Sequence, residues 1–388
     1  MQTDDATRFL PVPSSSADYS EWSNHASSLF VTGHMDLALV AARRALSLRR
    51  TPATLINLAV ILESQQKFYP AFPLSEEAHR LAPTDSIVSC HYSDALLRMG
   101  RLLEAWPLYS DSHTPWASLR RVWTEWDGIS SLKKKRILVL SGGGYGDTIL
   151  HSRWLPRLKD LGAHVTFMCP KTMHPLFDHS AYIDRLVAGS VAGIEGELVA
   201  KDYDCFVSLL ALARYFCPDT NHIPIAPYIH ADPRRESIRR NVLRSGAAPV
   251  FGICAVAGEE KVPRRNRSLS AEQISRIVRT RTRKGADWVN LNLDLMIPGT
   301  IQPAIRDWAD TAAILACLHL VVTVDTGVAH LAGAMGIPTY VILSGPSAAY
   351  YGATGDRNPF YPSHRLFRNG GEGIDASVSA VCERLEQS

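Results

Sequence analysis

One carboxylate follows a glycine-rich turn. In "SGGGYGDTILHSRWLP" (141–156), Asp147 comes after Gly144, Tyr145 and Gly146, and Thr148 follows it. No lysine follows the turn as it would in a P-loop. Counted from either possible starting glycine, the G-x-G-x-x-G dinucleotide fingerprint does not end in glycine. A carboxylate at a helix N-terminus caps N–H groups but repels a diphosphate. Two interpretations follow: a plain helix cap, or an acceptor or base beside which the glycines clear space for a ligand.

A second turn combines small residues with a histidine. The stretch "TVDTGVAHLAGAMGIPTYVIL" (323–343) predicts strand, tight turn, helix and strand, with Asp325 ending the first strand. Thr326 and Gly327 open the helix, so their N–H groups can bind an anion with the help of the helix dipole. His330 lies four residues after Thr326 and therefore on the same helical face. This turn predicts a phosphate-binding element.

A basic loop lies upstream of that turn. "AGEEKVPRRNRSLS" (257–270) follows a predicted strand and contains Lys261, Arg264, Arg265 and Arg267. Such a concentration of positive charge matches a diphosphate through charge-assisted hydrogen bonds. The alternative interpretation is a solvated surface loop.

Two alternating series of strands and helices hold these turns. Short apolar runs predict strands that alternate with helix-length segments, which implies βαβ units and parallel sheets. The runs are "RILVL", "HVTFMC", "RLVAG" and "CFVSLL" in the first series, and "VFGICAV", "DWVNLN", "LVVTV" and "TYVIL" in the second. A polar stretch at 230–249 separates the series. Open α/β sheets bind ligands beyond the carboxyl ends of their strands, so we expect a ligand cleft between two such halves.

The segment before these halves is helical and repetitive. Ala38, Ala71 and Ala105 follow similar motifs and are 33 and 34 residues apart. That period and the small residues indicate about three tetratricopeptide-like repeats, the third degenerate at Ser112, although a generic helical bundle stays open. The predicted parts are a mobile leader at 1–18, helical repeats at 19–115, a linker at 116–135, and Rossmann-like domains at 136–248 and 249–388.

Composition restricts the class of protein. The chain has 388 residues, 46% hydrophobic and 20% charged, which is typical of a soluble globular protein with more than one domain. A net charge of +3 does not demand a nucleic-acid partner, nor does it exclude one. The seven cysteines show no C-x-x-C pair, and no signal peptide or membrane-spanning stretch is visible, so we expect a cytoplasmic protein with reduced thiols.

The motifs together resemble a known family. "GYGDTILHSRWLP", "AGEEKVPRRNRSLS", "DWADTAAILACLHLVVTVDTGVAHLAGAMGIP" and "FYPSHRLFRNG" occur in the order found in tetratricopeptide-repeat glycosyltransferases related to the bacterial heptosyltransferases. The resemblance covers residues 136–385. It implies the GT-B fold, two Rossmann-like domains facing each other, behind an all-α N-terminal part. It departs at "SGPSAAYYGATGDRNP" (344–359), where relatives commonly carry a Trp- and Arg-containing segment.

The resemblance also implies roles for the residues above. Asp147 matches the candidate base of an inverting, metal-independent transfer, within the loop formed by Gly144, Tyr145, Gly146 and Thr148. A nucleotide sugar is the donor substrate and no cofactor is expected. The donor site is expected from the C-terminal domain, with the diphosphate contacted by Thr326, Gly327 and His330 of the Asp325–His330 element and supported by Lys261, Arg265 or Arg267.

The acceptor and two other functions stay open at this point. The helical repeats offer a surface suited to a protein or peptide acceptor, while glycan, lipid and modified DNA bases are further candidates. A degenerate, non-catalytic binding protein is one alternative function. A nucleotide-sugar epimerase or hydrolase that needs no acceptor is the other.

Overall fold

The computed structural model of the protein describes most of the chain. It covers residues 12–14, 16–113, 119–120, 123–190, 193–194, 202–243, 248–258, 267–345, 347–368 and 373–387. Most of the predicted leader, part of the predicted linker, and the basic residues Lys261, Arg264 and Arg265 lie outside the described residues. The roles predicted for these three side chains therefore stay predictions.

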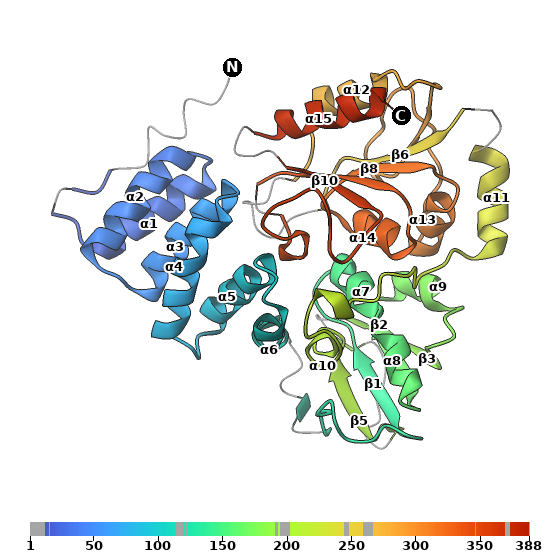
Figure 1. The fold of residues 1–388 in the computed structure, drawn as a ribbon, viewed down its shortest axis with the longest axis horizontal. Helices are drawn as coiled ribbons and strands as arrows, with labels where there is room; N and C mark the ends of the chain where they lie inside the picture. Colours follow the sequence, from blue (N-terminus) through green and yellow to red (C-terminus); the bar gives the residue numbers. More distant parts are fainter. Residues whose placement is uncertain are drawn as a thin grey trace.

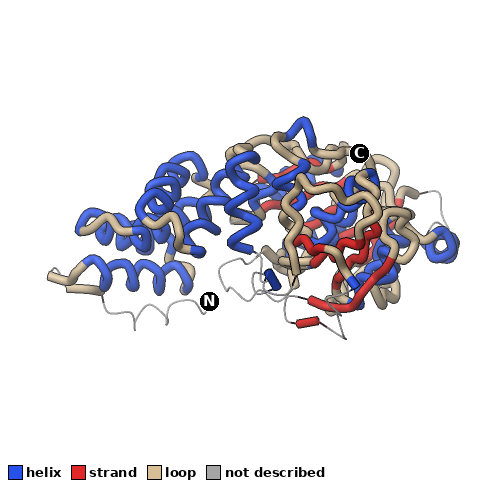
Figure 2. Tube along the Cα trace, turned by 90° about the horizontal axis from the view of Figure 1, so that it is seen from below, coloured by secondary structure: helices blue, strands red, loops and turns tan. Residues whose placement is uncertain are grey.

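Six helices form the N-terminal part and extend to one side of the molecule (Figures 1 and 2). They are α1 (Tyr19–Val31), α2 (Met35–Leu48), α3 (Pro52–Ser64), α4 (Phe68–Leu81), α5 (Ser86–Arg98) and α6 (Leu102–His113). They pack as consecutive pairs, α1 with α2, α3 with α4, and α5 with α6. Capping boxes begin α1 at Asp18 and α3 at Thr51, where Pro52 occupies the first turn.

The repeated alanines explain why these helices pack closely. Ala38, Ala71 and Ala105 lie on the second helix of each pair, and each is fully buried. A side chain of one methyl group lets two helix backbones approach, so a repeat of alanines produces a repeat of helix pairs. The all-α N-terminal part predicted from the sequence is confirmed.

A five-stranded sheet follows, in the order β4-β3-β2-β1-β5. Its pairs are parallel except β3 with β4. The elements of this half, with the connector helix α11 last, are β1 (Arg136–Leu140), α7 (Tyr145–Ser152), α8 (Leu155–Asp160), β2 (His164–Cys169), α9 (His174–Phe177), β3 (Arg185–Ser190), β4 (Gly193–Ile194), β5 (Cys205–Ser208), α10 (Leu212–Phe216) and α11 (Pro233–Leu243). The four strands predicted here all form.

A second five-stranded sheet, parallel throughout, has the order β10-β9-β8-β6-β7. Its elements are β6 (Val250–Cys254), α12 (Ala271–Arg279), β7 (Asp287–Asn290), α13 (Trp308–Leu315), β8 (Leu320–Val324), α14 (Gly327–Ala334), β9 (Thr339–Leu343), the 3₁₀ turn η6 (Ala349–Tyr351), β10 (His364–Arg368) and α15 (Ile374–Glu386). The strand β10 was not among the predicted strands. Two parallel α/β sheets behind a helical part confirm the predicted fold class.

The largest apolar core does not follow the predicted division of the chain. It joins Tyr92, Trp106 and Tyr109 of α5 and α6 to residues of both α/β halves. A separate core forms between α1, α2, α3 and α4 around Ala26, Ala41 and Leu62. The last helix pair therefore packs as part of the α/β body, while the proposed domain boundaries themselves stay a prediction.

Two features bear on the environment of the protein. In the described part of the chain, no helix combines the length and the apolarity that crossing a bilayer requires. The seven cysteines, which all lie in described residues, form no disulfide bond.

Candidate active site

The glycine turn holds Asp147 in a defined orientation. Gly144 is the N-cap of α7, and Asp147, three residues later, accepts the Gly144 N–H through Oδ2 at 2.8 Å. Gly143 has φ +70°, and a Cβ there would overlap the Asp147 carboxylate. Only glycine adopts this positive φ easily and has no Cβ to overlap the carboxylate, so the turn needs glycine at this position. The carboxylate does cap the helix, yet only one of its two oxygens is used for this.

The other oxygen of Asp147 faces two tyrosines from distant parts of the chain. Tyr350 of η6 donates to Oδ1 at 3.0 Å, and the Tyr109 hydroxyl of α6 lies 3.5 Å from the same oxygen. The two tyrosine hydroxyls are hydrogen-bonded to each other. Both rings are buried, whereas Asp147 is half-buried.

His330 is buried on α14 and is oriented by a third tyrosine. Its Nδ1 lies 3.1 Å from the Tyr361 hydroxyl, which is 3.4 Å from the Tyr228 hydroxyl. When Tyr361 donates to Nδ1, the proton of a neutral imidazole lies on Nε2. Burial lowers the pKa of His330, although the carboxylates of Asp325 and Asp147 oppose this shift. The imidazole is therefore neutral near pH 7.

The two predicted turns meet at this histidine. A Cβ added at Gly146 would lie 2.7 Å from His330 Cδ2 and 3.2 Å from Nε2. Real Cβ atoms do not approach other atoms so closely, so the absence of a side chain at Gly146 lets α7 pack directly on α14. Figure 1 shows both helices where the two halves face each other. The turn residues Gly146 and Asp147 and the histidine thus belong to one site, although 183 positions separate Asp147 from His330 in the chain.

Asp325 and Arg267 form an ion pair at the end of β8. Arg267 Nη1 lies 3.2 Å from Asp325 Oδ2, and the same oxygen accepts the Ala348 N–H at 2.9 Å. Burial would raise the pKa of Asp325, but the charge of Arg267 and the hydrogen bond from the Ala348 N–H hold it below its ordinary value. A buried, ionised carboxylate orients Arg267 and the loop before η6. Because the Asp325 carboxylate is itself negatively charged, it is better suited to orienting these groups than to contacting a phosphate.

The helix start at Thr326 is available for an anion. Thr326 is the N-cap of α14, and its side chain makes no capping hydrogen bond. Its hydroxyl lies 3.2 Å from that of Thr323 instead. The N–H groups of the first turn are thus not taken by the capping side chain, which leaves the positive end of the helix for a ligand. Gly327 is packed by Trp308, since a Cβ there would lie 2.6 Å from Trp308 Cη2.

The remaining residues of the glycine turn differ in exposure. The Tyr145 ring is 44% exposed and contacts the Trp308 ring across the two halves, with centroids 5.2 Å apart. Its hydroxyl lies 3.3 Å from Thr172 Oγ1. Thr148 is buried at 2% exposure, so its side chain supports the helix rather than facing a ligand.

A buried arginine links the two halves behind His330. The Arg153 guanidinium donates to Leu150 O at 2.9 Å and to Phe360 O at 3.0 Å. It also lies within 5.5 Å of the ring centroids of Tyr228, Phe360 and Tyr361. These carbonyl and aromatic contacts replace the water that a buried cation loses.

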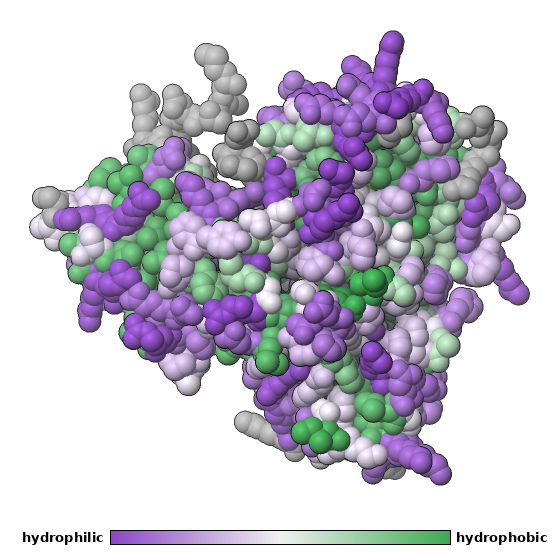
Figure 3. All heavy atoms as spheres, viewed as in Figure 1, coloured by the Kyte–Doolittle hydropathy of each residue, from purple (hydrophilic) through white to green (hydrophobic). Residues whose placement is uncertain are grey.

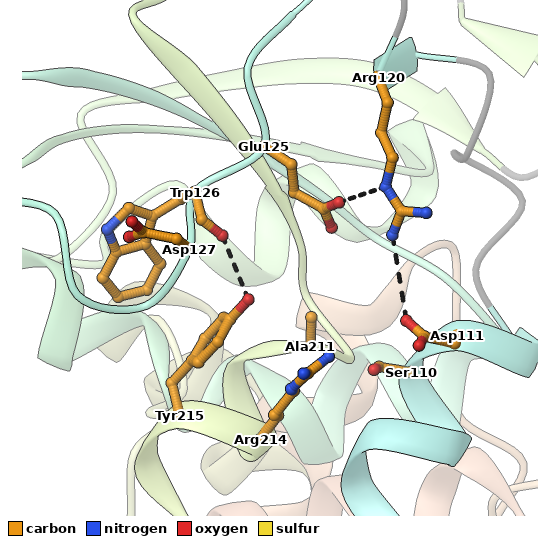
Figure 4. A pocket seen from close by; sticks show the side chains of 9 residues that line it. All are labelled: Ser110, Asp111, Arg120, Glu125, Trp126, Asp127, Ala211, Arg214 and Tyr215. Atoms are coloured by element: carbon orange, nitrogen blue, oxygen red, sulfur yellow. Dashed lines mark hydrogen bonds and ion pairs between the residues drawn. The ribbon is translucent and has the colours of Figure 1, made fainter.

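A pocket of about 160 Å³ has a different lining (Figure 4). It is bounded by α6, the segment around Trp126 and α10, and charged side chains of both signs line it, among them Asp111, Arg120 and Glu125. None of the residues predicted for the site lines it. We therefore assign it neither the donor nor the acceptor.

Sequence reasoning found part of this arrangement. The structure brings together Gly146, Asp147 and His330, with Asp325 and Arg267 alongside. Sequence reasoning missed Tyr109, Tyr350, Tyr361, Trp308 and Arg153. The tyrosine pair 350–351 in the departing segment "SAAYYGATG" was the available hint, because paired aromatics in a loop next to a motif often line a site. Among the described residues, no group of three or more His, Cys, Asp or Glu side chains could hold a metal ion.

The two parallel sheets joined by helix α11, behind a tetratricopeptide-like helical part, are the architecture expected for the GT-B fold class. Comparison with known families is consistent with this class. The model of glycosyltransferase family 9 (heptosyltransferase) matches residues 307–357, which include Trp308, the Asp325–His330 element and Tyr350. The resemblance to the heptosyltransferases and the enzyme class predicted from the sequence are thereby confirmed. No curated protein matches the chain.

Several solved structures are similar to parts of the chain. A family 9 glycosyl transferase from Veillonella parvula DSM 2008 has a TM-score of 0.46 and 13% identity, covering 62% of this chain and 88% of its own. The E. coli heptosyltransferase WaaC, solved with ADP, has a TM-score of 0.44 and 14% identity, covering 65% and 97%. The O-GlcNAc transferase of Thermobaculum terrenum has a TM-score of 0.33 and 15% identity, covering 95% and 85%. The fold assignment rests on the two sheets of this chain, not on these similarities.

Proposed function

We propose that the protein transfers a sugar from a nucleotide-sugar donor to an acceptor hydroxyl where α7 meets α14. One observation supports this most strongly: the Gly146–Asp147 turn packs on His330, next to the free helix start at Thr326. A base and a phosphate-binding element are thus adjacent, which is the arrangement that glycosyl transfer to a hydroxyl requires.

The proposed reaction is a direct displacement at the anomeric carbon of the donor sugar. The acceptor oxygen attacks the anomeric carbon, and its proton passes to Asp147 Oδ1 or Oδ2. The bond between that carbon and the diphosphate oxygen breaks, and the diphosphate leaves with the electron pair. Attack opposite the leaving group inverts the anomeric configuration.

The leaving diphosphate is held by the opposite half in this proposal. The N–H groups of Gly327 and the following turn of α14 donate to it, and the neutral His330 donates through Nε2–H. Arg267, held by Asp325, supplies positive charge, and Lys261 and Arg265 of the basic loop add to it. With these cations in place we propose a metal-independent transfer, so EDTA should leave turnover unchanged. Loss of turnover in EDTA that magnesium or manganese restores would contradict this.

The acceptor is proposed to be a protein, peptide or glycan recruited by α1 to α4. These helices carry exposed apolar side chains, among them Leu37, Val40 and Tyr69, on the surface of the helical part (Figure 3). Exposed apolar side chains of this kind are more stable in contact with a partner molecule than in contact with water.

Donor binding is the direct test of the proposed function. Melting curves are measured with a panel of UDP-, GDP-, ADP- and CMP-sugars. A ligand at about a hundred times its dissociation constant should stabilise the fold by about 2.7 kcal/mol. His330→Ala should weaken binding of the stabilising compound by about 1.5–3 kcal/mol, the usual effect of losing a hydrogen bond to a charged group. His179→Ala, at a 73% exposed side chain, is the matched control.

The outcomes separate the alternatives. No stabilisation by any nucleotide sugar, or equal affinity in His330→Ala, would contradict the donor site. Binding without turnover would indicate the non-catalytic alternative. Turnover that does not respond to added acceptors would indicate a hydrolase or epimerase.

A further inference from the structure

Asp147 receives hydrogen bonds from parts of the chain that no motif connects to it. Tyr350 belongs to the second α/β half, and Tyr109 belongs to the last helix of the helical part. We propose that Tyr350 and Tyr109 are positioning residues for Asp147, and that α6 thereby completes the active site. This inference rests on the proposed role of Asp147 as the base.

The hydroxyl geometry fixes an order among the three groups. Each tyrosine has one proton to donate. Tyr350 is the nearer to the carboxylate, at 3.0 Å against 3.5 Å for Tyr109. Tyr350 therefore donates to Asp147 Oδ1, and Tyr109 donates to the Tyr350 oxygen. Donation from Tyr109 makes the Tyr350 proton more acidic and strengthens its bond to the carboxylate.

Burial keeps both donors in place and protonated. Tyr109 is 5% and Tyr350 4% exposed. Burial, aided by the Asp147 charge, raises the pKa of both tyrosines well above its ordinary value. The two rings also pack on His151 of α7, whose Nε2 lies 3.4 Å from the Tyr350 hydroxyl. The pair cannot rotate away without opening this aromatic cluster.

The carboxylate keeps room for an acceptor. A carboxylate offers about four acceptor sites. Tyr350 uses one site of Oδ1, and the Gly144 N–H uses one site of Oδ2. The two fixed donors hold the carboxylate plane and leave about two acceptor sites of this half-buried side chain for an incoming hydroxyl. A base held in this way needs no reorientation when the acceptor arrives.

The position of Tyr109 gives the helical part a second role. Trp106, one turn earlier on α6, is 1% exposed and donates its indole N–H to Cys217 O at 2.8 Å. This bond fixes α6 against the first α/β half, and Tyr109 then reaches the site. The last repeat is in this way part of the catalytic body rather than only a recruiting surface.

The test uses the full chain and removes single hydroxyl groups. Tyr350→Phe and Tyr109→Phe are compared with Tyr92→Phe, a control that removes the hydroxyl of a buried tyrosine on α5, away from Asp147. The assay follows release of nucleoside diphosphate, across pH, from the nucleotide sugar that stabilises the protein best. The groups facing Asp147 are Tyr109 of α6, Tyr350 of η6 and His330 of α14.

The expected results depend on the order of the groups. Tyr350→Phe should lower kcat/KM by about tenfold near pH 7, since a hydrogen bond to a charged acceptor is lost, and Tyr109→Phe by about threefold. In Tyr350→Phe the acid limb of the kcat/KM profile should move to higher pH, because Asp147 loses a hydrogen-bond donor. In Tyr109→Phe it should move in the same direction by less, because the Tyr350 donor stays but is weakened. Donor affinity should stay unchanged, and Tyr92→Phe should behave as wild type.

A double-mutant cycle separates positioning from general structural support. In an Asp147→Asn background, Tyr350→Phe should cause no further loss of rate, because both changes act on the same group. An additive loss, or an acid limb that does not move, would overturn the inference. If Asp147→Asn alone is as fast as wild type, the proposed function fails instead, and the two failures are thereby distinguished.

Discussion

The contacts of Asp147 fit both interpretations that the sequence left open, a helix cap and a base. Its Oδ2 caps the N-terminus of α7 through the Gly144 N–H, and its Oδ1 faces the tyrosine pair. A helix cap requires only the first contact. The second, together with the packing of Gly146 on His330, supports the proposed role as a base. The capping contact holds the carboxylate in one orientation, and a base benefits from such a fixed orientation. The two roles therefore do not exclude each other.

Buried histidines near the site predict a loss of stability in mild acid. His364 is 1% exposed, and burial, with the charge of His330, lowers its pKa to about 3. Below about pH 6.5 the unfolded chain binds a proton that the folded chain does not bind until about pH 3. The free energy of unfolding should therefore fall as pH decreases through this window, by up to about 1.4 kcal/mol per pH unit.

Replacement of His364 tests whether this residue causes the pH dependence of the unfolding free energy. His364→Gln should reduce the difference in unfolding free energy between pH 6.5 and pH 5 by about 2 kcal/mol. Urea unfolding at the two pH values measures it, with His222→Gln, at a 58% exposed side chain, as the control. If the difference in unfolding free energy between the two pH values is the same in wild type and His364→Gln, a group other than His364 causes it.

At the scale of elements, the connector α11 is fastened to α13 by charge. Asp310 of α13 has a side chain that is 1% exposed and lies 3.0 Å from Arg235 and 3.6 Å from Arg239, both of α11. Arg306 binds the same carboxylate at 2.9 Å. Burial would raise the pKa of Asp310, but the hydrogen bonds and charge of Arg306 and the charge of Arg239 lower it to about 2.

Removal of this charge should loosen the connector. Asp310→Asn should reduce the free energy of unfolding near pH 7 by about 2 kcal/mol, since Arg239 and Arg306 then face a neutral group, while Arg235 keeps its ion pair with Asp307. The stabilisation from Asp310 is complete above about pH 4 and disappears toward pH 2, so the variant and wild type should converge in strong acid. Chemical unfolding measures this difference. Asp375→Asn, which removes an exposed pair with Arg276, should change little, and an equal loss in both variants would contradict the assignment.

The elements were predictable where the sequence pattern is local. Apolar runs of strand length gave eight of the strands, and the alanine period gave the helix pairs, because burial acts on each short segment directly. The strand β10 was missed, since "HRLFR" carries two arginines and reads as polar although three of its residues are buried. The contact of Tyr109 with Tyr350 joins positions 241 residues apart, so only the packed fold reveals it.

For the whole molecule, the shared core changes what the helical part does. Tyr92, Trp106 and Tyr109 pack in one core with both α/β halves, and Arg98 of α5 donates to Ser347 O at 2.6 Å in the loop before η6. By contrast, α1 to α4 share a core of their own, and a small further core joins α3 and α4 to Val88 of α5. The main change in packing therefore falls within the helical part, near α5, rather than after α6.

Two truncations test this boundary. Deletion of residues 1–115 should abolish cooperative melting and donor binding, because it opens the shared core. Deletion of residues 1–48, which removes α1 and α2 only, should leave donor binding near that of the full chain. Melting curves with and without the stabilising nucleotide sugar give both results. A 1–115 deletion that folds and binds as tightly as the full chain would show that α6 is dispensable.

The Asp147→Asn variant tests whether Asp147 removes the acceptor proton. Asparagine keeps the size and a side-chain oxygen that can accept the Gly144 N–H, so the melting temperature and the donor dissociation constant should stay close to wild type. Turnover of the nucleotide sugar should fall on the order of a hundred- to ten-thousand-fold, the usual contribution of a positioned base. A stable Asp147→Asn variant with near-normal turnover would contradict the account, because Asp147 would then be a helix cap and no more.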